Sequence, residues 1–271
     1  MKVEIDGLRL ELADSYADLN AAEQLDLVKL VVRRTGETVP DIFVFIEILE
    51  VLVKAGYAKK FRKMPFRKFW RKLKLSPEQL RFLELGFEWV YERPTTAFTH
   101  FDFENERFYV VKERFEHTSA AEFTEGLMDF IDLSKGDEGA LNRLIANFCR
   151  PERADLADFM ASDKWNGDNR EKYNRQRAVD RSKSFDKLDA GVKVWFLWHY
   201  DALINAFFDE YEELFSGGGE KRYEDGRGYL MVLKNAAKNH YLGSFEAVQE
   251  VDVNVVYSLL LDDYYDSKER D

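Results

Sequence analysis

The sequence has few residues of the kinds that crosslink or interrupt a chain, with one cysteine and five prolines among 271 residues. The single cysteine, Cys149, excludes an internal disulfide and any metal site built from several thiolates. It lies beside the apolar residues of a predicted helix. We therefore expect Cys149 to be a small buried core residue rather than a nucleophile.

Long apolar runs are also missing from the sequence. No stretch approaches the roughly 18 consecutive apolar residues that a membrane-spanning helix needs. The opening residues, Met1-Lys2-Val3-Glu4, lack the apolar core of a signal peptide. We therefore expect no transmembrane segment and a cytoplasmic location.

Spacings typical of catalytic and metal sites do not occur either. The histidines are His100, His117, His199 and His240. None of them forms an HxH, HxxxH or HExxH spacing, and Gly217-Gly218-Gly219 lacks the GxxxxGK[ST] pattern of a phosphate-binding loop. We therefore predict no enzyme and no cofactor, and we name no catalytic, cofactor-binding or metal-binding residue. An enzyme whose carboxylates or histidines meet only in the folded chain is kept as an alternative.

Aromatic residues and charges are abundant. The 22 Phe, 13 Tyr and 5 Trp belong to a hydrophobic fraction of 45%, which argues against disorder although 34% of the residues are charged. A chain of 271 residues can bury roughly three quarters of its unfolded surface. We therefore expect a folded protein with a core rich in aromatic side chains.

The charge is unevenly distributed along the chain. Residues 54–74, the basic segment, hold seven Lys, three Arg and no acidic residue, so with −11 overall the other residues together carry −21. The candidate partner-binding residues are Lys59, Lys60, Arg62, Lys63, Arg67, Lys68, Arg71 and Lys72, which alternate with aromatic residues. Three interpretations stay open for them: a solvated face, a docking surface for an acidic protein partner, or a surface for nucleic acid or a membrane.

The clearest helical pattern covers residues 119–151. Ser119 and Glu122 form a capping box, which predicts a helix start, and the apolar residues after it recur at helical spacing. A turn at residues 135–137 leads to a second apolar stripe, which Pro151 closes. The stripes are Phe123, Leu127, Phe130 and Ile131, then Leu141, Leu144, Ile145 and Phe148. Two such stripes joined by a short turn predict an antiparallel helical pair.

The rest of the pattern predicts a mainly α helical bundle with two small β-hairpins. One hairpin is N-terminal, around Asp6-Gly7, and the other lies near residues 98–111. Further helices are expected at 20–34, 41–57, 76–90, 192–215, 229–241 and 251–265, and a long exposed loop at 152–168. Residues 1–115 and 116–271 could form two domains or one continuous domain.

Several short stretches of the sequence resemble a known group of proteins. They are residues 15–19 (SYADL), 118–123 (TSAAEF), 141–151 (LNRLIANFCRP), 169–174 (NREKYN) and 242–257 (LGSFEAVQEVDVNVVY). These stretches are similar to uncharacterised proteins of tailed phages and prophages of Bacteroidetes type, which look like tail assembly chaperones or tail-accessory proteins.

The resemblance implies a non-enzymatic assembly or structural protein that acts through protein–protein contacts. Its partner would be an aggregation-prone tape-measure protein or a tail-tube subunit, held until assembly by apolar grooves and complementary charge. Its location would be the cytoplasm of a bacterial host, or the virion. A nucleic-acid-associated protein that uses the basic segment is the alternative.

Overall fold

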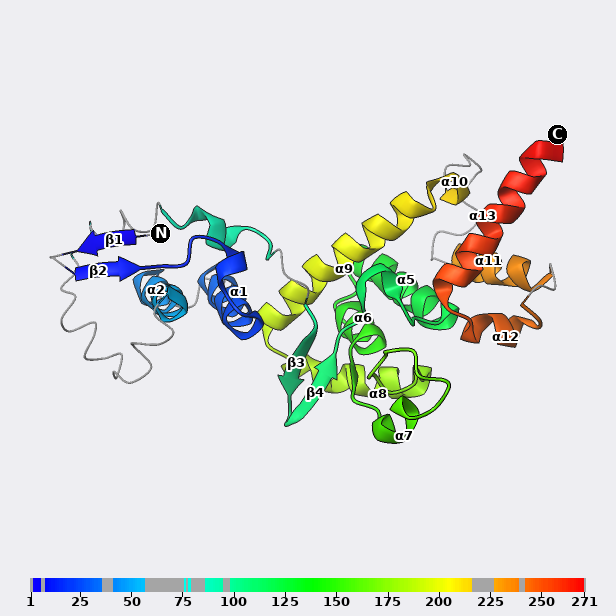
Figure 1. Ribbon diagram of the computed structural model, residues 1–271, viewed down its shortest axis with the longest axis horizontal. Coiled ribbons are helices and arrows are strands. Elements are labelled where there is room, and N and C mark those ends of the chain that lie inside the picture. Colours follow the sequence, from blue (N-terminus) through cyan, green and yellow to red (C-terminus); the bar gives the residue numbers. More distant parts are fainter. Residues whose placement is uncertain are drawn as a thin grey trace. The chain divides into compact units, whose positions relative to one another are not determined.

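The computed structural model describes residues 2–5, 8–35, 41–56, 76, 78, 86–94, 98–215, 227–238 and 242–270 (Figure 1). The chain divides into two compact units. Unit 1 comprises Met1–Phe98 with Asp189–His199, and unit 2 comprises Thr99–Leu188 with Tyr200–Asp271. The candidate cations of the basic segment, at positions 59–72, lie outside the described residues, as do His240 and the glycines at 217–219. Separate domains at 1–115 and 116–271 stay a prediction.

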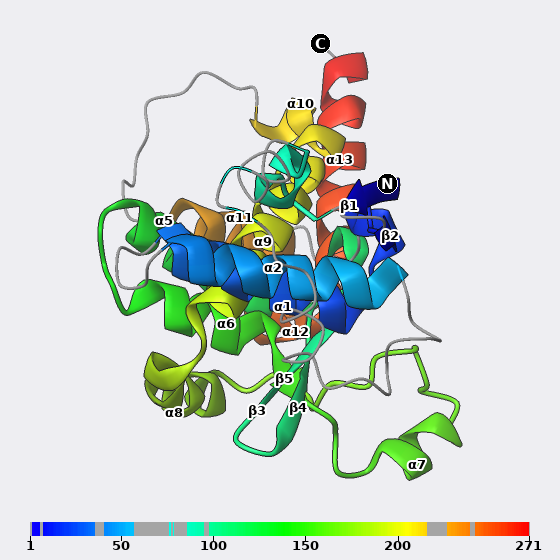
Figure 2. The same ribbon diagram turned by 90° about the vertical axis from the view of Figure 1, so that its left-hand side faces the viewer.

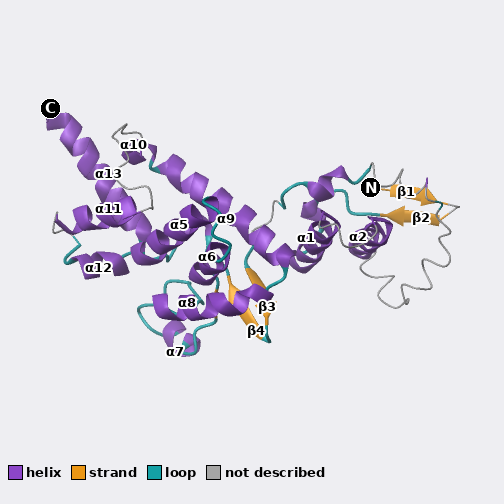
Figure 3. Cartoon of the chain, turned by 180° about the vertical axis from the view of Figure 1, so that it is seen from behind, coloured by secondary structure: helices purple, strands orange, loops and turns teal. Residues whose placement is uncertain are grey.

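The fold is mainly α, as the sequence predicts. The α-helices are α1 (Ala21–Thr35), α2 (Asp41–Gly56), α5 (Ala120–Ser134), α6 (Ala140–Phe148), α7 (Leu156–Met160), α8 (Arg175–Ser184), α9 (Ala190–Glu210), α10 (Glu212–Phe215), α11 (Arg227–Lys238), α12 (Phe245–Glu250) and α13 (Val253–Arg270). The strands are β1 (Lys2–Ile5), β2 (Leu8–Glu11), β3 (His100–Phe103), β4 (Glu106–Tyr109) and β5 (Arg150–Pro151), drawn in orange in Figure 3. Within these described ranges, no helix is both long enough and apolar enough to cross a membrane.

Both predicted hairpins are present. Strands β1 and β2 pair antiparallel, with Val3 opposite Leu10, and β3 and β4 pair with Phe101 opposite Phe108. The short strand β5 adds to the second hairpin, so that the sheet has the order β3-β4-β5. This third strand is not predicted by the sequence pattern, which shows only a proline at the end of a helix.

Unit 1 is built around α1 and α2. Its core contains apolar side chains from both helices, namely Leu27, Val28, Val31, Val44, Ile48, Leu49 and Leu52. The first turn of α9 comes very close to α1, because a Cβ atom on Gly191 would lie 2.6 Å from the Cα atom of Lys29. Only glycine fits at that position without a shift of backbone. The Tyr16 hydroxyl donates to the carbonyl of Val90 at 2.7 Å, which ties the segment before α1 to the 3-10 helix Glu88–Tyr91.

Unit 2 contains the predicted antiparallel pair, α5 and α6. The Ser119 side chain accepts a hydrogen bond from the Glu122 N–H at 3.2 Å and caps α5, as the sequence predicts. The Glu122 carboxylate takes a different role from the one expected in a capping box, since it forms ion pairs with Arg150 and Arg170. Helix α8 lies alongside α6, below it in both Figure 1 and Figure 2.

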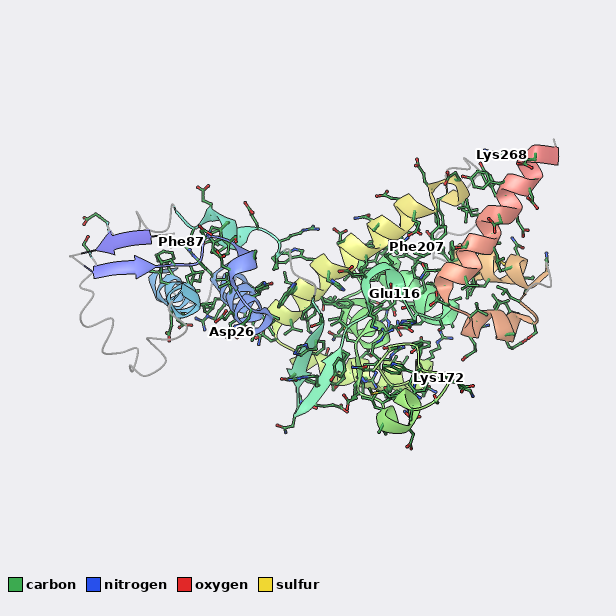
Figure 4. The ribbon with its side chains drawn as sticks, viewed as in Figure 1. Asp26, Phe87, Glu116, Lys172, Phe207 and Lys268 are labelled. Carbon is green, nitrogen blue, oxygen red and sulfur yellow. The ribbon has the colours of Figure 1, made fainter. Side chains whose placement is uncertain are left out.

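An aromatic core fills unit 2 between α5, α6, α9 and α13. Its members are Phe115, Phe123, Phe148, Tyr200, Phe207 and Tyr257, all fully or almost fully buried. The Phe123 and Phe207 ring centroids are 4.5 Å apart, and Phe207 is labelled among the side chains between α9 and α5 in Figure 4. Gly126 of α5 leaves room for the ring of Phe148, whose Cε2 atom would lie 2.2 Å from an added Cβ.

The expected loop at residues 152–168 is more ordered than the sequence indicates. It contains the short helix α7, and its ends are held together because the Arg153 N–H donates to the Asn169 carbonyl at 2.9 Å. The Glu171 N–H likewise donates to the Pro151 carbonyl at 2.9 Å. These bonds place the returning chain beside β5, and this explains how residues 150 and 170 come to lie together.

Candidate functional site

Unit 2 contains a cavity of about 590 Å³, which we call the charged cavity. Its walls come from the segment before α5, from β5 and the loop that follows it, and from the turn between α12 and α13. The lining residues are His117, Thr118, Ser119, Glu122, Arg150, Arg153, Phe159, Lys164, Asn166, Asp168, Arg170, Glu171, Lys172 and Tyr173, with Glu250 and Asp252 on the remaining side. The cavity is therefore assembled from parts of the chain more than 100 residues apart in sequence.

Four buried charges form the floor of this cavity. The buried charge cluster consists of Glu122, Arg150, Asp168 and Arg170. Arg150 Nη1 lies 2.8 Å from one Glu122 oxygen, and Arg170 Nη1 lies 3.3 Å from the other. Arg170 Nε lies 2.9 Å from an Asp168 oxygen, and Arg150 Nη2 is 3.8 Å from Asp168. The two positive and two negative charges alternate, which offsets part of the cost of removing each one from water.

Arg170 is held in place by backbone groups as well as carboxylates. Its Nη1 donates to the carbonyl of Phe148 at 3.2 Å, and its Nη2 donates to the carbonyl of His117 at 3.5 Å. The Asp168 side chain also accepts from the Arg170 N–H at 3.1 Å, which fixes the turn that carries both residues. Arg170 thus connects the end of α6, the segment before α5 and the loop after α7.

The segment that leads into α5 carries unusual backbone conformations. Arg114, Phe115 and His117 have φ values of 57°, 54° and 60°, which side chains with a Cβ rarely adopt. Such residues cost on the order of 1 kcal/mol each and persist only where surrounding contacts hold them. Here Phe115 is anchored in the aromatic core, and the His117 N–H donates to Asp252 Oδ2 at 3.0 Å. His117 itself lines the charged cavity.

Asp168 and the two arginines of the cluster carry fixed charges rather than charges poised to exchange protons. Burial alone would raise the pKa of Asp168, but the Arg170 and Arg150 guanidiniums outweigh it and hold this pKa below its ordinary value. Burial lowers the pKa of Arg150, while Glu122 and Asp168 together raise the pKa of Arg170 against its own burial. An arginine stays protonated in proteins. Arg150, Asp168 and Arg170 therefore keep their charges at neutral pH.

Cys149 directly precedes Arg150 of the cluster, and its thiol is buried. The residue is fully buried, so the prediction of a core cysteine is confirmed. Burial raises the pKa of its thiol far above the ordinary range, against the influence of the neighbouring arginines. Because the thiolate is the reactive form, burial disfavours a nucleophilic role for this side chain.

The rim of the cavity carries further cations. Arg153 makes a bidentate ion pair with Asp155, with N–O distances of 2.7 and 2.9 Å. Its Cζ atom lies 3.5 Å from the centroid of the Phe159 ring. Lys172, labelled in Figure 4, lies 2.6 Å from Glu250 in an exposed pair. The rim is thus polar and partly aromatic, above a floor of buried charge.

Of the residues singled out from sequence alone, His117 lies at the charged cavity. All eight candidate cations of the basic segment lie outside the described residues. Of the histidines, His117 lines the cavity, His100 is in β3 and His199 is in α9. In the carboxylate run after residue 208, Glu210 pairs with Arg114, and Glu213 accepts from the Tyr265 hydroxyl at 2.8 Å. Among the described residues, no group of three or more His, Cys, Asp and Glu side chains is arranged to hold a metal ion.

Comparisons with protein families, with curated proteins and with solved structures give no match to this chain.

Proposed function

We propose that this protein binds a protein partner without catalysing a reaction, as an assembly or structural protein of a tailed phage or prophage. The proposed partner is a tape-measure protein or a tail-tube subunit, bound in the cytoplasm of the bacterial host or in the virion. The phage assignment is supported by the sequence stretches at 15–19, 118–123, 141–151, 169–174 and 242–257. Two of these stretches contribute Arg150 and Arg170 to the buried charge cluster.

The observation that carries the binding function is the fixed charge of the cavity. Enzymes that transfer protons need groups whose pKa values lie near the working pH. Here Asp168 is held ionised by two guanidiniums, and Cys149 is held protonated by burial. Fixed and paired charges suit recognition, in which a constant pattern of donors and acceptors selects a partner. An enzyme with a site assembled in space stays the weaker proposal.

The alternative function is binding of nucleic acid through the basic segment. Ten cations and no acidic residue within positions 54–74 can neutralise phosphates, and the aromatic residues between them can stack on bases. The same positive segment also suits an acidic surface on a protein partner. Added salt distinguishes nucleic-acid binding from protein binding, because an affinity that comes from phosphate neutralisation falls steeply and predictably as the salt concentration rises.

A tagged capture experiment from the native host, at low and at moderate salt, tests these proposals. Recovery of tail-tube or tape-measure proteins, identified by mass spectrometry, supports the assembly function. Recovery of nucleic acid alone, lost at moderate salt, supports the alternative instead. Capture of neither a tail component nor nucleic acid at low salt contradicts both.

A pair of variants locates the contact. The first reverses Arg67, Lys68, Arg71 and Lys72 to Glu, and the matched control reverses the exposed Lys183, Lys187, Lys234 and Lys238. Both variants change the net charge by the same amount. If the basic segment is the contact, the first variant loses the partner and the control keeps it. Equal loss in both variants shows that only the overall charge matters.

A further inference from the structure

We propose that the charged cavity of unit 2 binds a small organic anion, whose carboxylate or phosphate group is held by Arg150. The same cavity supports the binding function proposed above, but anion binding at Arg150 does not depend on the identity of the protein partner. The chemistry that recognises the ligand is an oxyanion facing the planar fork of a guanidinium, which carboxylates and phosphates share.

Arg150 has buried donor groups that lack an acceptor within hydrogen-bond distance in the described part of the chain. The side chain is 3% exposed, and Nη1 faces a Glu122 oxygen at 2.8 Å. Nε has no hydrogen-bond acceptor among the described residues. Nη2 is 3.8 Å from Asp168, beyond hydrogen-bond distance. Buried donors of this kind almost always have a partner, so an acceptor is missing here.

The carboxylates around the cavity already have partners. Asp168 accepts from Arg170, and Glu171 pairs with Arg177 and Arg181. Asp252 accepts from the His117 N–H and from Asn254, and Glu250 pairs with Lys172. Donor groups of the cavity therefore lack acceptors, whereas its carboxylate acceptors already have donors. This imbalance favours an anion over a cation as the ligand.

Two further donors line the same cavity, one of them buried and one exposed. The Thr118 hydroxyl is completely buried and has no hydrogen-bond partner among the described residues, and Thr118 lines the cavity beside Arg150. At the rim, the exposed Lys164 has no ion-pair partner in the described part of the chain. An oxyanion above Arg150 would add acceptors for the buried donors, and Lys164 would add long-range attraction.

The cavity also has the size and walls of a small-molecule site. A volume of about 590 Å³ falls within the range of known ligand pockets, roughly 300–1,000 Å³. The Tyr173 ring lies 5.7 Å from the Arg150 Cζ atom, and Phe159 lies under Arg153. These rings offer apolar surface for the carbon skeleton of the ligand. A small organic anion would thus place its charged group on the floor and its body against the aromatic walls.

Isothermal titration calorimetry on the full chain tests the proposal with inorganic phosphate and with succinate at low ionic strength. Potassium chloride at matched ionic strength serves as the reference. We expect saturable binding of at least one of the two anions, and the better one identifies the phosphate or the carboxylate as the preferred group. Absence of saturable binding of both anions overturns the proposal.

Variants then separate this cavity from other cationic surfaces. Arg150→Lys keeps the charge but removes the fork, and should weaken binding about tenfold. Because a buried arginine can be needed for folding, Thr118→Val and Lys164→Gln are measured as well, and each should weaken binding several-fold. Lys187→Gln, an exposed cation outside the cavity lining, is the matched control and should bind like the native chain. Unchanged affinity in Thr118→Val and Lys164→Gln contradicts the assignment to this cavity, whatever Arg150→Lys does.

Discussion

Glu122 and Phe123 follow one another on α5, and both are buried, at 1% and 0% exposure. Phe123 enters the aromatic core, where its ring meets Phe115, Phe207 and Tyr257. Glu122 enters the buried charge cluster, where it faces Arg150 and Arg170. Two kinds of interior therefore meet along one helix. The aromatic core and the buried charge cluster differ in how much stability the fold loses when one side chain is removed.

An apolar interior gains stability from each side chain separately, since burial and dispersion contacts add with area. A charged interior behaves differently, because bringing two ions out of water costs about as much as their attraction returns. The pair as a whole then contributes little, but the loss of one member leaves its partner buried and uncompensated. The buried charge cluster is therefore expected to be more sensitive than the aromatic core to single substitutions.

The largest expected effect is the loss of Arg170. Arg170→Met leaves Glu122 and Asp168 with only Arg150 as a counter-charge and removes the bonds to Phe148 and His117. We expect the free energy of unfolding to fall by about 3–5 kcal/mol, measured by urea denaturation. The control is Arg107→Met, which breaks the exposed pair with Asp102 and should change the free energy of unfolding very little. A loss for Arg170→Met no greater than in this control would show that the cluster is not stabilising.

The aromatic core gives the next largest effect, through Gly126. In Gly126→Ala the new methyl group would meet the buried ring of Phe148, so either the ring or the helix must move. We expect a loss of about 1–3 kcal/mol in urea denaturation, although alanine favours a helix more than glycine does. If the clash with the Phe148 ring is the cause, Gly126→Ala should cost less stability in a Phe148→Leu background than in the native chain.

Gly228 provides the matched control for that substitution. It also lies in a helix, α11, but an added Cβ there would meet nothing within 4 Å. Gly228→Ala should therefore leave stability unchanged or raise it by up to about 1 kcal/mol. Equal destabilisation by both alanine substitutions would contradict the role of close contact at Gly126.

The two interiors also differ in how far the sequence predicts them. In the apolar stripe of α5, Phe123 and Leu127 are buried as predicted, whereas Phe130 and Ile131 are half-buried. The second stripe places Leu144, Ile145 and Phe148 in the core in the same way. Periodicity is a local property, so one stretch of sequence is enough to detect it.

The buried charge cluster has no comparable local pattern. The spacing of Glu122 from Ser119 predicts a capping box, and only the tertiary structure shows that the Glu122 carboxylate faces two arginines. Arg150 and Arg170 are 20 residues apart and meet because the chain returns past α7 to lie beside β5. The one available signal was Arg150 directly after the apolar Phe148 and Cys149, which placed a charge at the end of a buried stripe.

A smaller loss of stability is expected at the N-terminal cap of α5, the helix that carries both Glu122 and Phe123. Ser119→Ala removes the side chain that accepts from the Glu122 N–H and caps α5. We expect a loss of about 1 kcal/mol, measured as a lower midpoint in urea, because the first turn loses one acceptor. Ser244→Ala removes the corresponding cap of the short helix α12, where Ser244 accepts from the Ala247 N–H at 3.3 Å, and should have a smaller effect. A larger loss at Ser244 would show that α5 does not depend on its cap.

The smallest effects are expected in the pH dependence, where two carboxylates of unit 2 act in opposite directions. The pKa of Asp168 is lowered by its guanidinium partners, so its ionised form stabilises the fold above about pH 4 and this contribution is lost as the pH falls further. Burial raises the pKa of Asp129 despite its bonds to Arg143 and Asn147. The folded chain then binds a proton more readily than the unfolded chain, so this group adds stability as the pH falls towards about 4.

Urea denaturation of Asp168→Asn and Asp129→Asn between pH 7 and pH 3 separates these two contributions. Both variants are compared by the slope of the unfolding free energy against pH, because either can also change stability at neutral pH. Asp168→Asn should lose less stability on acidification than the native chain does, since the lowered pKa is gone. Asp129→Asn should lose more, since the group that gains a proton in the folded state is gone. Slopes that change in the same direction in both variants would contradict the view that guanidiniums dominate at Asp168 while burial dominates at Asp129.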